Sequence, residues 1–169
     1  MSTIPVYCCQ IQTDDVDFVA NLLEKDNFIR QNSSNILIKS NVDLNIQIDL
    51  SQSFQSPSII YCCSINSLLQ LLSFHKQTSD SIVSLIFSIQ SKNEIDWNSL
   101  INLITTYNLS LNIVKDENDL RKKLDDIIRN LVKQNFSKKS TLHSNQSSPT
   151  KETQVIHRIN HFLSDDIRF

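Results

Sequence analysis

The chain has 169 residues, 40% of them apolar, and a formal net charge of −2. It contains no glycine, which excludes the P-loop, the dinucleotide fingerprint and the EF-hand loop, so we expect no nucleotide cofactor and expect asparagine and serine to form the turns. The length predicts one domain. The four cysteines form two adjacent pairs without a secretory leader, which predicts free thiols in a reducing compartment. No apolar run reaches the roughly 20 residues that cross a bilayer, so we predict no membrane span.

The first third of the chain predicts a strand, a helix and a hairpin. Residues 4–11 (IPVYCCQI) predict a strand, and residues 14–27 predict a helix with acids in its first turn, where the helix dipole favours them. Residues 35–40 and 42–50 alternate apolar and polar side chains. This alternation is typical of half-buried strands, so we predict a β-hairpin that turns near Asn41.

The rest of the domain repeats a strand followed by a helix. The predicted strands cover residues 58–63, 82–90 and 109–114, and the predicted helices cover residues 65–74, 93–107 and 117–134. This alternation favours right-handed crossovers, a mainly parallel central sheet and helices on both faces. We therefore predict a three-layer α/β domain over residues 3–135. A flexible polar linker over 136–152 and a short amphipathic helix over 153–169 should follow it.

Two adjacent cysteines, Cys62 and Cys63, stand where the strand 58–63 meets its helix. They lack the C-x-x-C spacing of a metal or redox pair, and neighbouring positions of a strand face opposite sides of the sheet. We therefore interpret them as small packing residues. His157 and His161 have the i,i+4 spacing of two metal ligands, but no third ligand lies nearby in the sequence, so we predict no metal site.

Two acids follow the predicted strand 82–90. Glu94 and Asp96 stand where open α/β sheets place their ligands, which would suit a metal-dependent hydrolase. The alternative, which we favour, is helix capping, with Asn93 as the N-cap and both acids in the first turn. Trp97 shares a helix side with Leu100, which favours core or interface packing over base stacking.

Basic charge is concentrated in the late helix. Residues 1–114 carry five basic and ten acidic side chains, whereas residues 115–139 carry eight basic and five acidic ones, or −5 against +3. Such a helix is usually solvated and supported by i,i+4 pairs such as Arg121 with Asp125 and Asp125 with Arg129. It could also contact DNA phosphates without sequence preference. The candidate DNA-binding residues are Arg121, Lys122, Lys123, Arg129, Lys133, Lys138 and Lys139.

The order of the predicted elements resembles that of a known family. A strand, a helix, a hairpin and three strand–helix units are similar to the nuclease-like domain of the XPF superfamily of structure-specific endonucleases. Catalytic members carry an E-R-K-x-x-x-D motif at the junction that YCCSINS fills here. The resemblance implies an inactive nuclease, with Asp49 as the displaced counterpart of an upstream metal-binding acid. The positions of the Glu, Arg, Lys and Asp are taken by Tyr61, Cys62, Cys63 and Ser67.

Among the inactive members, the chain is most similar to the small meiotic sporulation protein sixteen family. NEIDWNSL resembles the acid and tryptophan that open a helix in that family, and a hydrophobic strand like LSLNIV follows. The resemblance implies a non-enzymatic nuclear subunit on chromosomes, without a cofactor. It implies that the subunit forms a heterodimer with a larger XPF-like protein (SHOC/Zip type), binds branched DNA through this complex and promotes meiotic crossovers. The superfamily's C-terminal helix-hairpin-helix module is missing or reduced to residues 153–164.

We expect the partner to bind apolar helix faces of the chain. The candidate interface residues are Ile65, Leu68, Leu72, Phe74 and Trp97. Alternatives that the sequence leaves open are an α/β scaffold that acts through protein contacts alone, a non-catalytic XPF-family partner in DNA repair, and an enzyme that uses Glu94 and Asp96 or the thiols.

Overall fold

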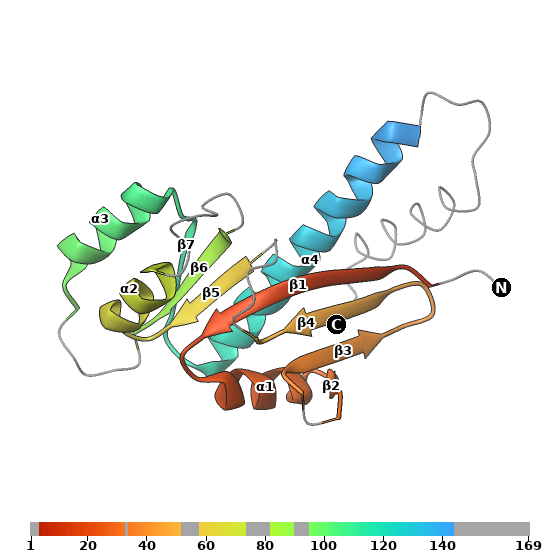
Figure 1. Cartoon of the computed structure of the whole chain (residues 1–169), viewed down its shortest axis with the longest axis horizontal. Coiled ribbons are helices and arrows are strands. Elements are labelled where there is room, and N and C mark those ends of the chain that lie inside the picture. The colour runs from red at the N-terminus through yellow and green to blue at the C-terminus, as the bar shows by residue number, and fades with distance from the viewer. Residues whose placement is uncertain (1–3, 33, 52–57, 74–81, 90–94, 144–169) are drawn as a thin grey trace.

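A computed structural model describes the chain over residues 4–32, 34–51, 58–73, 82–89 and 95–143. The described residues form one seven-stranded mixed sheet and four helices (Figure 1). The strands are β1 (Val6–Thr13), β2 (Ile29–Arg30), β3 (Ile36–Ser40), β4 (Asn45–Asp49), β5 (Ser58–Cys62), β6 (Ile82–Ser88) and β7 (Leu111–Val114). The helices are α1 (Val16–Lys25), α2 (Ile65–Ser73), α3 (Trp97–Tyr107) and α4 (Glu117–His143).

The sheet is parallel except at one end. Its strand order is β2-β3-β4-β1-β5-β6-β7, in which β1 pairs parallel with β4 and β5, and β6 pairs parallel with β5 and β7. β3 pairs antiparallel with both β2 and β4. The predicted α/β class, the hairpin and the mainly parallel sheet are therefore confirmed. β2 was not predicted, because two residues are too few to show a periodic pattern.

Asparagine supplies turns in this glycine-free chain, as predicted. Asn27, Asn32 and Asn108 have φ values of 65°, 43° and 50°, in the left-handed region that glycine usually occupies. In the turn between β3 and β4, the Asn41 side chain accepts hydrogen bonds from the backbone N–H groups two and three residues further on, at 2.9 and 2.7 Å. Such a side-chain turn fixes the hairpin without glycine.

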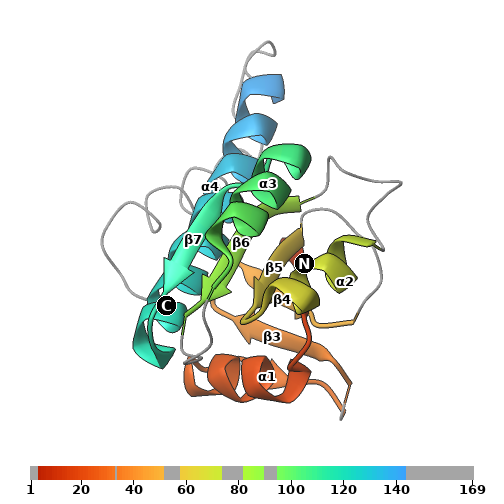
Figure 2. The same ribbon diagram turned by 90° about the vertical axis from the view of Figure 1, so that its left-hand side faces the viewer.

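Helices pack on both faces of the sheet but cover them unequally (Figure 2). On one face, α1 and α4 enclose the larger buried cluster with inward side chains of β1, β3, β4 and β5. On the other face, α2 and α3 enclose a smaller cluster over β5, β6 and β7. The predicted three layers are therefore present over these three strands. No described helix covers the second face of β3 and β4 (Figure 1).

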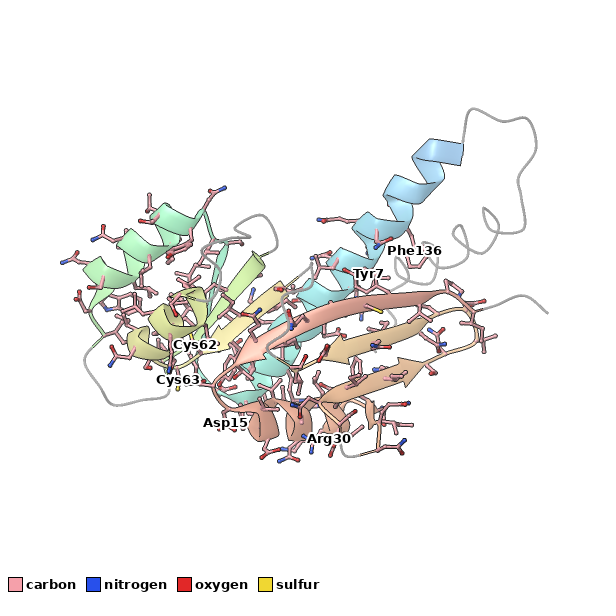
Figure 3. The ribbon with its side chains drawn as sticks, in the orientation of Figure 1. Tyr7, Asp15, Arg30, Cys62, Cys63 and Phe136 are labelled. Carbon is pink, nitrogen blue, oxygen red and sulfur yellow. The ribbon has the colours of Figure 1, made fainter. Side chains whose placement is uncertain are left out.

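Helix α4 is longer than the sequence predicted. It has 27 residues and a length of about 40 Å at 1.5 Å per residue. The predicted linker is wrong for residues 136–143, which are helical, because Phe136 is only 3% exposed and packs in the same cluster as Tyr7 (Figure 3). The rest of that linker and the predicted helix 153–169 lie outside the described residues. Although α4 is long, neither it nor another described helix is apolar enough to cross a membrane.

Replacing Phe136 with alanine should lower the free energy of unfolding by about 3–5 kcal/mol, because the change empties a buried aromatic site. Urea denaturation followed by circular dichroism measures this loss. Asn135→Ala, at the exposed neighbouring position, is the matched control and should change the free energy by less than about 0.5 kcal/mol. Equal stabilities of the two variants would show that α4 does not pack against the sheet at residue 136.

Candidate functional site

The carboxyl ends of β1 and β5 form the candidate site. These strands are parallel neighbours, but α1 follows β1 on one face of the sheet and α2 follows β5 on the other. In open α/β sheets, such a divergence of helices creates the crevice in which ligands bind. The YCCSINS segment runs through this point, and Figure 3 shows Cys62, Cys63 and Asp15 at the same end of the sheet.

Two of the four positions compared with the nuclease motif point into the cores. Tyr61 belongs to the larger cluster and stacks on Phe18 of α1, with 6.0 Å between ring centroids. Cys62 is fully buried in the smaller cluster. Burial raises the pKa of the Tyr61 hydroxyl and of the Cys62 thiol, so both are protonated at neutral pH. Neither side chain is available as a nucleophile or a metal ligand.

The other two positions, Cys63 and Ser67, lie beside Asp14, which directly follows β1. Ser67 Oγ donates a hydrogen bond of 2.5 Å to Asp14 Oδ2 and accepts one of 2.8 Å from Ser64 Oγ. Ser64 Oγ in turn accepts the Ser67 backbone N–H at 3.1 Å, which caps the start of α2. The Asp14 carboxylate is thus held against the first turn of α2, where the helix dipole favours a negative charge.

Sequence reasoning missed Asp14 and pointed to Asp49 instead. Asp49 ends β4, and β1 separates β4 from β5; its Oδ1 accepts the backbone N–H of Ser51 at 2.7 Å. The two acids directly after the first strand were the available signal, but both were assigned to the start of the helix. Asp15 does cap α1, because it accepts the Phe18 backbone N–H at 3.0 Å, whereas Asp14 contacts α2.

The side chains at the ends of β1 and β5 are poorly suited to nucleophilic or metal-dependent catalysis. Desolvation first, and the charge of Asp14 second, raise the pKa of the Cys63 thiol, which makes it a poor nucleophile at neutral pH. Within the residues that the structure describes, no group of three or more His, Cys, Asp or Glu side chains is placed to hold a metal ion. Phosphodiester hydrolysis needs several oxygen ligands around its metal, whereas Asp14 is one carboxylate already bound to Ser67.

Each cysteine pair has one buried and one exposed member. Cys9 and Cys62 are buried, Cys8 and Cys63 are exposed, and all four are free thiols. Burial raises the pKa of Cys9 to about 12. The prediction that Cys62 and Cys63 are packing residues is confirmed for Cys62 and wrong for Cys63, because the strand ends before Cys63 and no longer directs it into the core.

The second candidate carboxylate site acts as a helix cap. Asp96, rather than the predicted Asn93, is the N-cap of α3. Its carboxylate accepts the Ser99 hydroxyl at 2.5 Å and the Ser99 backbone N–H at 3.2 Å, and these hydrogen bonds lower its pKa. Capping is therefore confirmed for Asp96, although the helix begins one turn later than predicted. Asn93 and Glu94 lie outside the described residues.

The structure corrects the predicted partner surface. Leu68 and Leu72 are 0% and 1% exposed and pack in the chain's own core, so the prediction that they contact a partner is wrong. The leucines of α2 occupy more than one helix side, and periodicity alone did not show which side faces the sheet. Trp97 is 46% exposed and Ile65 is half-buried. Phe74 lies outside the described residues.

Two arginines of the basic helix are engaged within the chain. Arg121 pairs with Asp26 at the end of α1, with Nε 3.2 Å from Oδ1, instead of with Asp125 as predicted. Arg129 pairs with Asp125 at 3.1 Å, as predicted. The pair between Arg121 and Asp26 joins α4 to α1, so this arginine has a structural role that reduces its availability to a ligand.

Three lysines of α4 remain without an ion pair to the described residues. Lys122, Lys123 and Lys133 are all at least partly exposed. Lys122 and Lys133 are separated by about three helical turns and therefore lie on the same side of α4. The side chains of Lys138 and Lys139, which also belong to α4, lie outside the described residues.

Alkylation of Cys63 should report on the charge of Asp14. Asp14→Asn removes a negative charge beside the thiol and should lower its pKa, so that its reaction with iodoacetamide at about pH 8 becomes about two- to fivefold faster. Peptide mass spectrometry can follow Cys63 in the native protein. Exposed Cys8 is the internal control and should react at the same rate in both proteins. An unchanged rate at Cys63 would contradict the placement of Asp14 beside it.

Two comparisons of the sequence with known proteins find no relative of this chain. A scan of the chain against models of protein families finds no match. No curated protein sequence matches the chain. The function of the site is therefore argued from its own residues.

Proposed function

We propose that the chain is a non-catalytic α/β subunit that forms a heterodimer with a larger XPF-like protein. Through this complex it binds and stabilises branched DNA recombination intermediates in the nucleus, on chromosomes, and so promotes meiotic crossover formation. In this proposal the chain binds no cofactor and hydrolyses no DNA itself.

The observation that carries this proposal is the set of contacts at the carboxyl ends of β1 and β5. Ser67, which stands at the place of a catalytic aspartate in the resemblance, is hydrogen-bonded to Asp14. Cys63, at the place of a catalytic lysine, carries no positive charge, and its raised pKa keeps it neutral. Within the part of the chain that the structure describes, this junction has no group of converging metal ligands, and its side chains bond to one another, which supports a subunit that acts by binding.

The order of the elements supports the XPF-like part of the proposal. β1 and α1 come first, the β3–β4 hairpin follows, and then come β5–α2, β6–α3 and β7–α4. This is the succession on which the resemblance is based, and β2 only extends the hairpin by two residues. The succession also places YCCSINS at the junction of β5 and α2, where catalytic members of the family carry their motif.

A helical layer without charge supports a protein partner. α2 and α3 together contain 20 residues and no Asp, Glu, Lys or Arg, whereas α4 alone contains 11 charged residues. The centres of protein interfaces are depleted of charge and enriched in aromatic and large apolar side chains. Leu69, Trp97 and Ile101 are 47%, 46% and 57% exposed on this layer. We assign the α2–α3 layer, defined by these three residues, to the partner.

The α2–α3 layer also fits a scaffold that acts through protein contacts alone. The two functions differ in what α4 does, because only a DNA-binding subunit uses its unpaired lysines. Lys122, Lys123 and Lys133 support the DNA-binding function, since exposed lysines without acidic partners are suited to phosphate contacts.

Trp97→Asp combined with Ile101→Asp should weaken binding of the XPF-like partner by about 30-fold or more, because the loss of an aromatic anchor typically costs about 2 kcal/mol. Co-purification from cells that express both subunits, followed by titration calorimetry, measures the loss. Ile29→Asp is the control, because it adds an aspartate outside the α2–α3 layer, at an isoleucine that is 70% exposed on β2. Normal binding by the double variant would place the partner elsewhere.

Charge reversal of Lys122, Lys123 and Lys133 to glutamate should weaken binding of the complex to a four-way DNA junction. The slope of log affinity against log salt should become shallower by about 2–3, because three phosphate contacts release fewer counterions. Fluorescence anisotropy over a range of KCl concentrations measures both effects. Lys115→Glu, outside α4, is the control. An unchanged slope would exclude α4 from the DNA interface, and equal affinity for junction and duplex would favour the scaffold.

A further inference from the structure

The two edges of the sheet are protected differently. β2 forms one edge with only two residues, and Arg30 there pairs with Asp17 at 3.4 Å and Glu24 at 3.6 Å. A short edge strand with charged side chains resists pairing with another chain. β7 forms the other edge with the sequence LNIV, which contains no charge and no proline, and its pairing with β6 has no bulge. The β7 edge therefore lacks the protection that β2 has.

The backbone of β7 has hydrogen-bonding groups on its outer side. The carbonyl of Ser110 accepts the backbone N–H of Leu85 in β6 at 2.8 Å, and the carbonyl of Val114 accepts that of Ile89, directly after β6, at 3.0 Å. Because backbone groups alternate in direction along a strand, those of Leu111 and Ile113 point away from β6. No other described strand pairs with them, and the Ile113 side chain is 40% exposed.

An apolar side of α3 lies next to this edge. Leu100 points into the core, and Trp97 and Ile101 lie one turn apart on the exposed side of the helix. The right-handed crossovers put α3 on the β7 side of α2 (Figure 2). α3 runs antiparallel to the strands with Leu100 toward the sheet, so the right-handed turn of the helix places Trp97 and Ile101 on the side nearer the β7 edge. We call Trp97, Ile101, Leu111 and Ile113 the β7 edge surface.

We propose that two copies of the chain pair through the β7 edge surface, with their β7 strands antiparallel across a two-fold axis. Leu111 of one copy lies opposite Ile113 of the other, and each such pair exchanges both backbone hydrogen bonds. Asn112 of each copy then faces the other at the axis. The pairing joins the two seven-stranded sheets into one continuous sheet.

Charge favours a second copy as the occupant of this surface. A two-fold contact brings each surface against itself, so a charged residue near the axis would meet the same charge. The β7 edge surface contains none, and α3 contains no charged residue. Along the chain, Asp96 directly precedes Trp97, and its carboxylate is bound to Ser99 of its own helix. Lys115 follows Ile113 by two residues and lies opposite Leu109 of the other copy in this register. The surface is therefore electrostatically compatible with itself.

Self-pairing does not rest on the proposed function, although the α2–α3 layer assigned to the partner shares Trp97 and Ile101 with the β7 edge surface. The two associations are therefore competitive, and the XPF-like partner should convert the homodimer into a heterodimer. A chain that dimerises but does not bind the partner would contradict only the proposed function. A monomeric chain that binds the partner would contradict only the self-pairing.

Sedimentation velocity of the full chain at about 1 to 100 µM tests the pairing, and the wild type should change from monomer to dimer over this range. Ile113→Pro should weaken the dimer by about tenfold or more. The N–H of Ile113 points outward, so proline removes a donor from the new interface while leaving the bonds to β6 intact. Ile29→Asp, at the opposite edge, should dimerise like the wild type. Thermal unfolding of each variant shows that the fold is retained.

A disulfide tests the register. Asn112→Cys, in a chain that also carries Cys8→Ser and Cys63→Ser, places two thiols opposite one another at a Cα separation of about 4.5 Å, which suits a disulfide. Mild oxidation should give a covalent dimer that a reductant separates, whereas Val42→Cys in the same chain should not. The proposal is overturned if the wild type is monomeric throughout, or if its dimer tolerates Ile113→Pro and Asn112→Cys gives no cross-link.

Discussion

The parallel pairing of β1 with β5 is the constraint on which the rest of the structure depends. It joins the hairpin half of the sheet to the half built from strand–helix units, and it is the point where the helices change faces. The same pairing divides the interior into a large cluster under α1 and α4 and a small one under α2 and α3. It also creates the topological switch point at which open α/β sheets normally bind their ligands. Core and candidate site are thus two results of one strand pairing.

The hydrogen bond between Asp14 and Ser67 lies at this switch point. A carboxylate at the first turn of α2 occupies the position that an anionic ligand would take, and the Ser64 cap directs the Ser67 hydroxyl toward it. The negative charge also disfavours the Cys63 thiolate, which is a second reason why nucleophilic chemistry is weak there. The hydrogen bond that joins β1 to α2 therefore also engages the Asp14 carboxylate, which contacts the start of α2.

The sequence predicted what depends on local pattern and missed what depends on distant neighbours. Period-two alternation and the Asn41 turn were enough for the hairpin, and the strand–helix alternation was enough for a mainly parallel sheet. Leu68 was assigned to the surface because α2 is apolar on two sides, and only packing over β5 and β6 decides between them. Phe136 was assigned to a linker because its neighbours are polar, although it packs in the cluster of Tyr7. Asp14 required the strand order, which places β1 rather than β4 beside β5.

Charge is segregated between the two helical layers, and this separates what each layer can bind. α1 and α4 are joined by two ion pairs, Lys25 with Glu117 at 2.5 Å and Arg121 with Asp26. Lys122, Lys123 and Lys133 of α4 take part in neither pair. α2 and α3 have no charge with which to form such pairs, so only apolar contact and hydrogen bonds can hold a partner there. A protein on the uncharged layer leaves the lysines of α4 exposed on the opposite face. In the proposed complex, the protein partner and the DNA would therefore contact opposite faces of the chain, and neither would cover the other's surface.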